Sequence, residues 1–184
     1  MCPPMKSVSK RAFVRLLAAA VVAGSALQAF AGTSAYTGPV GPVTKLPLPR
    51  YASLKTDRVN LREGPSKDHA IKWVYERAGL PIEITAEFEI WRRVRDSDGA
   101  EGWVLHSLLS GRRTALVMPW KKGDVSKIYR RADPKAEIAA TLQSRVIVNV
   151  RNCDGNWCLV DGEGFRGYIP QFELWGVYPH EKVQ

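Results

Sequence analysis

The sequence repeats one pattern at an interval of about 65 residues. Trp91-Arg92-Arg93-Val94 aligns with Trp157-Cys158-Leu159-Val160 at an offset of 66 residues, and Gly102-Trp103-Val104 aligns with Gly167-Tyr168-Ile169 at an offset of 65. Two copies of one domain explain this similarity. A copy of about sixty residues is near the lower size at which a single hydrophobic core suffices, so packing of one copy against the other would stabilise both.

From Tyr51 onward, short runs of β-favouring residues alternate with turn residues, and no long helical period is present. This pattern is typical of an all-β barrel or sandwich. We place copy one at residues 51–117 and copy two at residues 118–178, with a short tail at 179–184 and the boundary near Pro119. The strands expected in the first half are Val59–Arg62, Ile71–Tyr75, Pro81–Glu87, Ile90–Arg95, Gly102–Leu105 and Thr114–Val117.

Residues 1–31 have the features of a secretory signal peptide. Four basic residues and no acidic ones accompany an apolar run of about fifteen residues, and Ala29-Phe30-Ala31 fits the small-residue cleavage pattern. A membrane anchor is the alternative, but a span needs roughly 20 apolar residues. We expect cleavage between Ala31 and Gly32 and a periplasmic or secreted protein. The segment Ser9–Arg15 also approaches a twin-arginine signal, which leaves two export routes open.

The segment after the expected cleavage site, residues 32–50, contains four prolines and three glycines and has almost no hydrophobic period. Such a composition favours an extended linker.

Net charge narrows the class of partner. Removal of residues 1–31 takes away four of the 27 basic residues and none of the 18 acidic ones, which leaves a net charge of +5. This excess suits peripheral association with anionic polymers of the cell envelope. The basic residues form no five-residue block, and the protein is expected to be exported, so nucleic acid is not an expected partner.

Two cysteines remain after cleavage, Cys153 and Cys158, and they flank Asp154-Gly155-Asn156. A tight turn of this composition places the two cysteines opposite each other on paired strands. Thiols in an exported protein meet an oxidising compartment. A zinc site would need two more ligands, and a redox-active pair more often has the C-x-x-C spacing. We therefore expect a structural disulfide.

An enzyme is the less favoured class. The chain has three histidines, His69, His106 and His180, but adjacent residues on a strand point to opposite faces, so Asp68-His69 and His106-Ser107 form no relay by adjacency. A cysteine peptidase would need a free thiol beside a histidine, and both mature cysteines are expected to be paired. No glycine-rich phosphate loop or zinc-type cluster occurs. We expect no catalytic residue, no metal and no cofactor.

Three segments resemble the bacterial SH3-like domain family. Val59-Asn60-Leu61-Arg62-Glu63-Gly64-Pro65 is similar to its opening strand and loop, and Trp91–Val94 and Gly102–Val104 resemble its W-x-x-V hairpin and G-W-V closing strand. Copy two departs from this pattern, because Tyr168 stands where copy one has Trp103, and its Cys153–Cys158 hairpin is similar to a cysteine-bearing variant of the domain. The resemblance implies two tandem small SH3-like β-barrels that act as binding modules, often for cell-wall peptides or other envelope partners.

Aromatic side chains are the favoured candidates for ligand contact, although a small barrel also needs large side chains in its core. Tyr75 and Trp103 are the first choices, with Arg62 and Trp73 beside them, and copy one is expected to dominate binding. The first hypothesis is recognition of peptidoglycan peptide or glycan-peptide. The alternative is a module that docks an envelope protein, and an envelope hydrolase is the third possibility.

Overall fold

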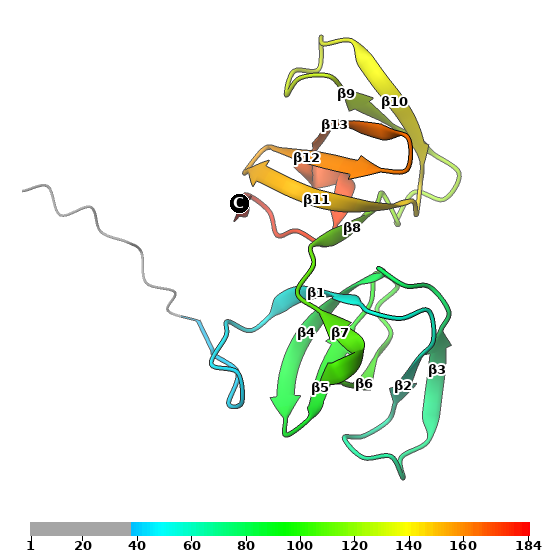
Figure 1. Cartoon of the computed structure of the whole chain (residues 1–184), viewed down its shortest axis with the longest axis vertical. Helices are drawn as coiled ribbons and strands as arrows, with labels where there is room; N and C mark the ends of the chain where they lie inside the picture. The colour runs from blue at the N-terminus through cyan, green and yellow to red at the C-terminus, as the bar shows by residue number, and fades with distance from the viewer. Residues whose placement is uncertain (1–37) are drawn as a thin grey trace, which may run out of the picture. The chain divides into compact units, whose positions relative to one another are not determined.

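The computed structural model describes residues 38–184, which form two antiparallel sheets and two short 3-10 helices (Figure 1). The expected signal peptide and its cleavage site at Ala31 and Gly32 lie outside the described residues. The first sheet, called barrel 1, has the strand order β3-β2-β6-β5-β4-β1-β7. Its elements are β1 (Arg50–Leu54), β2 (Val59–Arg62), β3 (Ile71–Tyr75), β4 (Pro81–Phe88), β5 (Trp91–Arg95), β6 (Glu101–Leu105), η1 (His106–Leu108) and β7 (Leu109–Ser110).

The second sheet, called barrel 2, has the order β10-β9-β13-β12-β11-β8-β14, with β15 paired to β11. Each position is taken by the strand that comes seven strands later in the chain, so the two sheets share one topology. The expected all-β fold of two tandem domains is confirmed. The elements are β8 (Thr114–Val117), β9 (Val125–Tyr129), β10 (Ile138–Gln143), β11 (Ile147–Asp154), β12 (Trp157–Gly162), β13 (Phe165–Pro170), η2 (Gln171–Glu173), β14 (Leu174–Trp175) and β15 (Lys182–Val183).

Each barrel has its own hydrophobic core, because alternate residues of its strands point inward. In β2, Val59 and Leu61 are buried while Asn60 and Arg62 are half-buried. The two core clusters share no residue. The fully buried side chains of barrel 1 are Leu54, Val59, Leu61, Ile82, Val94 and Val104, and those of barrel 2 include Val117, Ile128, Val148, Val160 and Ile169.

The glycine of each closing strand lies against the neighbouring strand. A Cβ atom on Gly102 would come within 2.6 Å of the carbonyl oxygen of Arg62, and one on Gly167 within 2.6 Å of the carbonyl oxygen of Tyr129. Only glycine permits this approach of β6 to β2 and of β13 to β9. The repeated glycine of the sequence therefore marks the same close contact in both barrels.

The domain boundary differs from the sequence-based expectation. Thr114–Val117 is a strand, as expected, but β8 pairs with β11 and β14 of barrel 2 instead of closing copy one. The chain thus passes between the barrels through residues 111–113, and not near Pro119. The local sequence of a short buried strand carries no information about which sheet it joins, and this explains the error.

The linker expected at residues 32–50 is not extended where the structure describes it. Residues 38–48, called the N-terminal hairpin, form a bridge between Val40 and Pro47 and bury Leu48 in the core of barrel 1. The buried carboxylate of Glu87 accepts hydrogen bonds from the backbone N–H groups of Val43 (3.0 Å) and Thr44 (2.8 Å). A side chain far along the chain therefore fixes a segment whose own composition favours an open conformation.

The tail expected at residues 179–184 is part of barrel 2, because β15 pairs with β11 and buries Val183. The turn that leads there begins at Gly176, with φ 127°, a conformation that side chains other than glycine rarely adopt. A Cβ atom at this position would also lie 2.5 Å from the carbonyl oxygen of Thr114. The turn at Gly176 therefore allows the chain to return to barrel 2, where β15 pairs with β11.

Hydrogen bonds connect residues of the two barrels. The hydroxyls of Ser53 and Thr114 lie 2.6 Å apart in a buried site, and the guanidinium of Arg145 donates two bonds to the carboxylate of Asp98 (2.9 and 2.7 Å). This second pair holds the pKa of Asp98 below its usual range.

Within residues 38–184, no helix has the length and apolar character that crossing a membrane requires.

Candidate binding cavities

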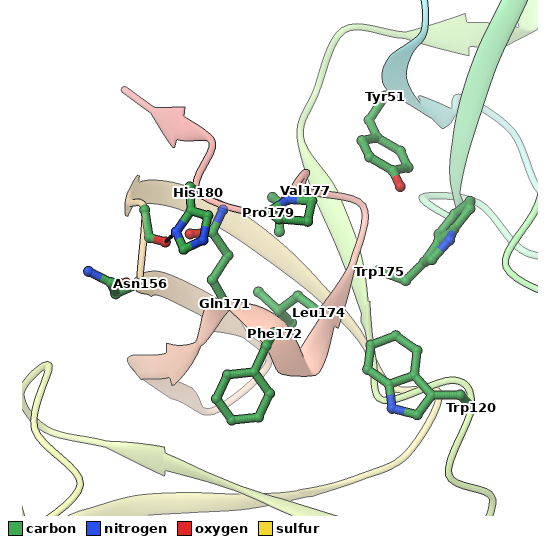
Figure 2. A pocket seen from close by; sticks show the side chains of 11 residues that line it. Tyr51, Trp120, Asn156, Gln171, Phe172, Leu174, Trp175, Val177, Pro179 and His180 are labelled. Carbon is green, nitrogen blue, oxygen red and sulfur yellow. Dashed lines mark hydrogen bonds between the residues drawn. The ribbon is translucent and has the colours of Figure 1, made fainter.

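One cavity, called the aromatic cavity, has a volume of about 410 Å³ and lies mainly on barrel 2 (Figure 2). Figure 2 shows the rings of Phe172, Trp120 and Trp175 around Leu174. The full lining consists of Tyr51, Trp120, Gly155, Asn156, Gln171, Phe172, Leu174, Trp175, Val177, Pro179 and His180.

Two aromatic rings of this cavity are open to solvent. Phe172 is 76% exposed and stands on η2, and Trp120 is 55% exposed in the loop that follows β8. The backbone N–H of Met118 donates to the carbonyl of Glu173 (2.7 Å), which ties the Trp120 loop to η2. The two rings are thus presented by segments that are bonded to each other.

The disulfide hairpin forms one wall. Cys153 and Cys158 are bonded and buried, as expected from the sequence, and the turn between them contributes Gly155 and Asn156 to the lining. The carboxylate of Asp154 accepts the backbone N–H groups of Trp157 and Asn156 (both 2.8 Å), and these bonds lower its pKa. The carbonyl of Asn156 in turn accepts the N–H of Gln171 (2.8 Å). The disulfide hairpin is therefore hydrogen-bonded to η2.

The segment after Gly176 forms the adjoining wall, where Nδ1 of His180 lies 3.1 Å from the carbonyl oxygen of Gly155. Gln171 holds this segment in place through hydrogen bonds. The buried side-chain amide of Gln171 donates to the carbonyls of Tyr178 (2.7 Å) and Glu181 (3.0 Å), while its Oε1 has no hydrogen-bond partner among the described residues. A bidentate ion pair between Glu181 and Arg113 fixes the same segment (2.8 and 3.0 Å).

The chemistry of the aromatic cavity suits an uncharged ligand surface. Among its lining residues, all described by the structure, none is Asp, Glu, Lys or Arg. Aromatic faces supply large contact area, and Asn156, His180 and Tyr51 supply hydrogen-bonding groups at the edge. Burial, followed by the charge of Glu83, raises the pKa of Tyr51 to about 12.

Barrel 1 has a cavity of about 340 Å³ at the equivalent place beside η1, called the arginine cavity. His106, Leu109 and Ser110 line it where Gln171, Leu174 and Trp175 line the aromatic cavity, each at an offset of 65 residues. The remaining lining residues are Thr44, Leu46, Arg50, Tyr51, Ala52, Ile84, Arg92 and Gly111.

The four residues predicted to contact ligand do not meet at one cavity. Arg62 lines a cavity of about 290 Å³ with Arg58 and Lys67, where its guanidinium donates to the carbonyls of Lys67 (2.9 Å) and His69 (2.7 Å). Trp103 is half-buried on β6 and pairs across the sheet with Arg62. The predicted set is therefore spread over several places on barrel 1.

Tyr75 and Trp73 border a further cavity of about 340 Å³ but differ in exposure. Tyr75 is only 4% exposed and belongs to the core of barrel 1, and its hydroxyl donates to Asp96 (3.0 Å). Burial and the neighbouring Asp96 carboxylate raise the pKa of this phenol. Trp73 is 60% exposed on the edge strand β3, so it is the more accessible of the two.

Sequence reasoning did not single out Phe172 or Trp120. Phe172 is the second residue after the closing strand of copy two. Trp120 lies at the expected domain boundary, where a tryptophan beside a proline is not needed for a strand core. His106 lies on η1, whereas His69 and His180 lie in two different loops. No group of three or more His, Cys, Asp or Glu side chains suited to a metal occurs within residues 38–184.

The sequence profile of the bacterial SH3 domain matches residues 55–111 and 122–176, well over half of the chain. The chain belongs to the bacterial SH3 domain family. Each match falls on one barrel, so the protein contains two tandem bacterial SH3 domains. No curated protein matches the chain.

Solved structures with some similarity to this tandem SH3 chain include two proteins from Trichomonas vaginalis. NlpC2 is 16% identical over 69% of this chain and 48% of its own, and NlpC1 is 15% identical over 73% and 48%, each with a TM-score of 0.31. An NlpC/P60 family protein from Bacillus cereus is 9% identical over 68% and 55%, with a TM-score of 0.30. The chain spans about half the length of these proteins.

Proposed function

We propose that this protein is an exported, non-catalytic binding protein of the cell envelope and that the aromatic cavity recognises peptide or glycan-peptide material of the cell wall. Bacterial SH3 domains are commonly cell-wall binding modules. The observation that carries the proposal is the exposure of Phe172 and Trp120, at 76% and 55%, beside a cavity of about 410 Å³. Exposed aromatic rings grouped at a cavity are typical of recognition surfaces.

The rigid walls of the aromatic cavity and the side chains that line it support ligand binding without catalysis. Its walls are fixed by the disulfide, by the Gln171 amide and by the Glu181–Arg113 ion pair, so little ordering is needed when a ligand enters. Aromatic side chains have few rotatable bonds to freeze, and truncating a central one can reduce binding by about 2 kcal/mol or more. The lining offers no activated nucleophile with an adjacent base.

Co-sedimentation with purified peptidoglycan tests the proposal. The mature protein should be retained by the wall, and an excess of soluble wall fragments should release it. Phe172→Ala and Trp120→Ala should each weaken retention by about thirtyfold, the equivalent of about 2 kcal/mol. Trp73→Ala is the matched control, because Trp73 is a tryptophan of similar exposure on barrel 1.

The same assay separates the alternatives. Loss of retention in Trp73→Ala alone would place the site on barrel 1, as the sequence first indicated. Failure of the folded wild-type protein to sediment, together with one cross-linked envelope protein, would favour the protein-docking alternative. Release of soluble wall fragments during incubation would contradict the non-catalytic part of the proposal.

A further inference from the structure

The aromatic and arginine cavities are repeats of one structural site. Both are lined by residues of a 3-10 helix and of the short strand that follows it, η2 and β14 in one barrel and η1 and β7 in the other. Tyr51 lines both cavities. Its ring packs edge-on against Trp175 (centroids 5.2 Å apart) and tilts against Tyr178 (4.6 Å). The two cavities therefore share a wall.

The linings differ in charge. The aromatic cavity has no charged lining residue, whereas the arginine cavity has Arg50 and Arg92 and, among its lining residues, no carboxylate. Both guanidiniums share one buried partner, the carboxylate of Glu87, at 2.8 Å and 3.5 Å. Because the two arginines share a single carboxylate, the arginine cavity has an excess of positive charge. Arginine is also suited to planar recognition of carboxylates.

We propose that one ligand occupies both cavities across Tyr51, with an uncharged ring-bearing part in the aromatic cavity and a carboxylate in the arginine cavity. Resting on the proposed function, this chemistry corresponds to a disaccharide that carries a short peptide. The sugar rings stack on Phe172, Trp120 and Trp175, and a peptide carboxylate lies beside Arg50. Because one ligand joins two sites, its affinity exceeds that of either part alone.

Titration calorimetry with three probes tests the inference: a disaccharide-tetrapeptide from muramidase digestion of purified wall, the free tetrapeptide, and the disaccharide without peptide. The complete probe should bind at least about tenfold more tightly than either part. Phe172→Ala should weaken the complete probe and the disaccharide but not the tetrapeptide. Arg50→Gln should weaken the complete probe and the tetrapeptide about tenfold but not the disaccharide.

Matched controls are present in the chain. Phe88→Ala removes a phenylalanine that is 49% exposed outside both cavities, and Arg151→Gln removes an arginine whose ion pair with Asp161 is on β11 and β12. Neither should change binding. Arg50→Lys keeps the charge but not the planar guanidinium, so its tetrapeptide binding should fall between that of the wild type and that of Arg50→Gln. Arg50→Gln could also release the N-terminal hairpin, because Arg50 pairs with Glu87. Ser110→Trp fills the arginine cavity and leaves Arg50 in place, so it should weaken the same probes as Arg50→Gln without that side effect.

Two results would overturn the inference. In the first, the complete probe binds no more tightly than its better half. In the second, the Phe172 and Arg50 variants weaken the same half, which would mean that one cavity holds the whole ligand. Either result with intact retention by the wall leaves the proposed function in place. If the wall does not retain the protein and no probe binds, both this inference and the proposed function are wrong.

Discussion

The phenol of Tyr178 donates a hydrogen bond of 2.9 Å to the buried carboxylate of Glu83, which lies 95 residues earlier in the chain on β4. Arg95 donates to the other oxygen of the same carboxylate (2.9 Å from Nε). Burial, with this hydrogen bond next, raises the pKa of Tyr178, so the phenol is protonated throughout the physiological range. The segment that walls the aromatic cavity is thus bonded to the sheet of barrel 1.

Replacement of Tyr178 by phenylalanine should destabilise the protein. The change removes the donor but keeps the ring, and it leaves one oxygen of a buried carboxylate without that bond. The free energy of unfolding should fall by about 1–3 kcal/mol. Urea denaturation followed by tryptophan fluorescence measures it. Tyr168→Phe, whose hydroxyl makes no side-chain hydrogen bond within residues 38–184, should lie within about 0.5 kcal/mol of the wild type, and an equal loss in both variants would contradict the assigned role.

Acid should release the N-terminal hairpin through Glu87. Burial alone would raise the pKa of this carboxyl, but hydrogen bonds from Thr44, Arg50 and Val43 outweigh it and lower the pKa to about 2. A group whose folded pKa is depressed contributes stability that is complete above its unfolded pKa of about 4.5 and is lost as pH falls toward 2.

The corresponding experiment compares wild type with Glu87→Gln. The difference in their free energies of unfolding should be largest near pH 7 and should shrink steadily between about pH 4.5 and pH 2. Glu137→Gln, at an exposed ion pair with Arg130, should show little dependence over this interval. A constant gap between wild type and Glu87→Gln would show that the carboxylate charge has no part in holding the hairpin.

Loss of the disulfide should loosen barrel 2 and leave barrel 1 largely unchanged. The bond closes a short loop with a sequence separation of 5, for which the chain-entropy estimate gives about 2 kcal/mol. A Cys153→Ala/Cys158→Ala variant should show faster amide hydrogen exchange in β11, β12 and β15, while exchange in β4 and β5 stays as it was. Uniform acceleration in both barrels would be inconsistent with a local role.

The mature protein should begin at Gly32. Ala29 and Ala31 supply the small side chains that a signal peptidase accepts after an apolar segment. Intact-mass measurement of protein isolated from the envelope fraction of cells that express the full chain decides this point. A mass that still includes residues 1–31 would indicate an uncleaved anchor.

Strand positions could be predicted because the inward-facing residues alternate within each short run, as Val59 and Leu61 do in β2. Strand partners could not, and Thr114–Val117 shows why: its four residues are all buried, so either barrel could accept it. The N-terminal hairpin was also missed, since Glu87, 43 residues away from Thr44, supplies the hydrogen bonds that its own sequence lacks.

The candidate site was harder to predict than the fold. Alternation places Trp73 and Tyr75 on the same face of β3, but only the structure shows that the core ends between them, with Tyr75 inside and Trp73 outside. Phe172 and Trp120 lie on a 3-10 helix and a loop, where no periodic pattern distinguishes a core residue from an exposed one. Exposure at such positions depends on tertiary contacts alone.

Gly111 and Gly176 occupy the same position in the two copies, directly after β7 and β14, but they direct the chain differently. Gly111 leads straight into the next barrel, whereas the positive φ of Gly176 turns the chain toward the disulfide hairpin. The two glycines thus hold equivalent positions, and within residues 38–184 Gly111 is the one that leads from one SH3 domain into another. A third barrel fused after Gly176 would have to displace β15 and the segment that Gln171 holds, and with them one wall of the aromatic cavity.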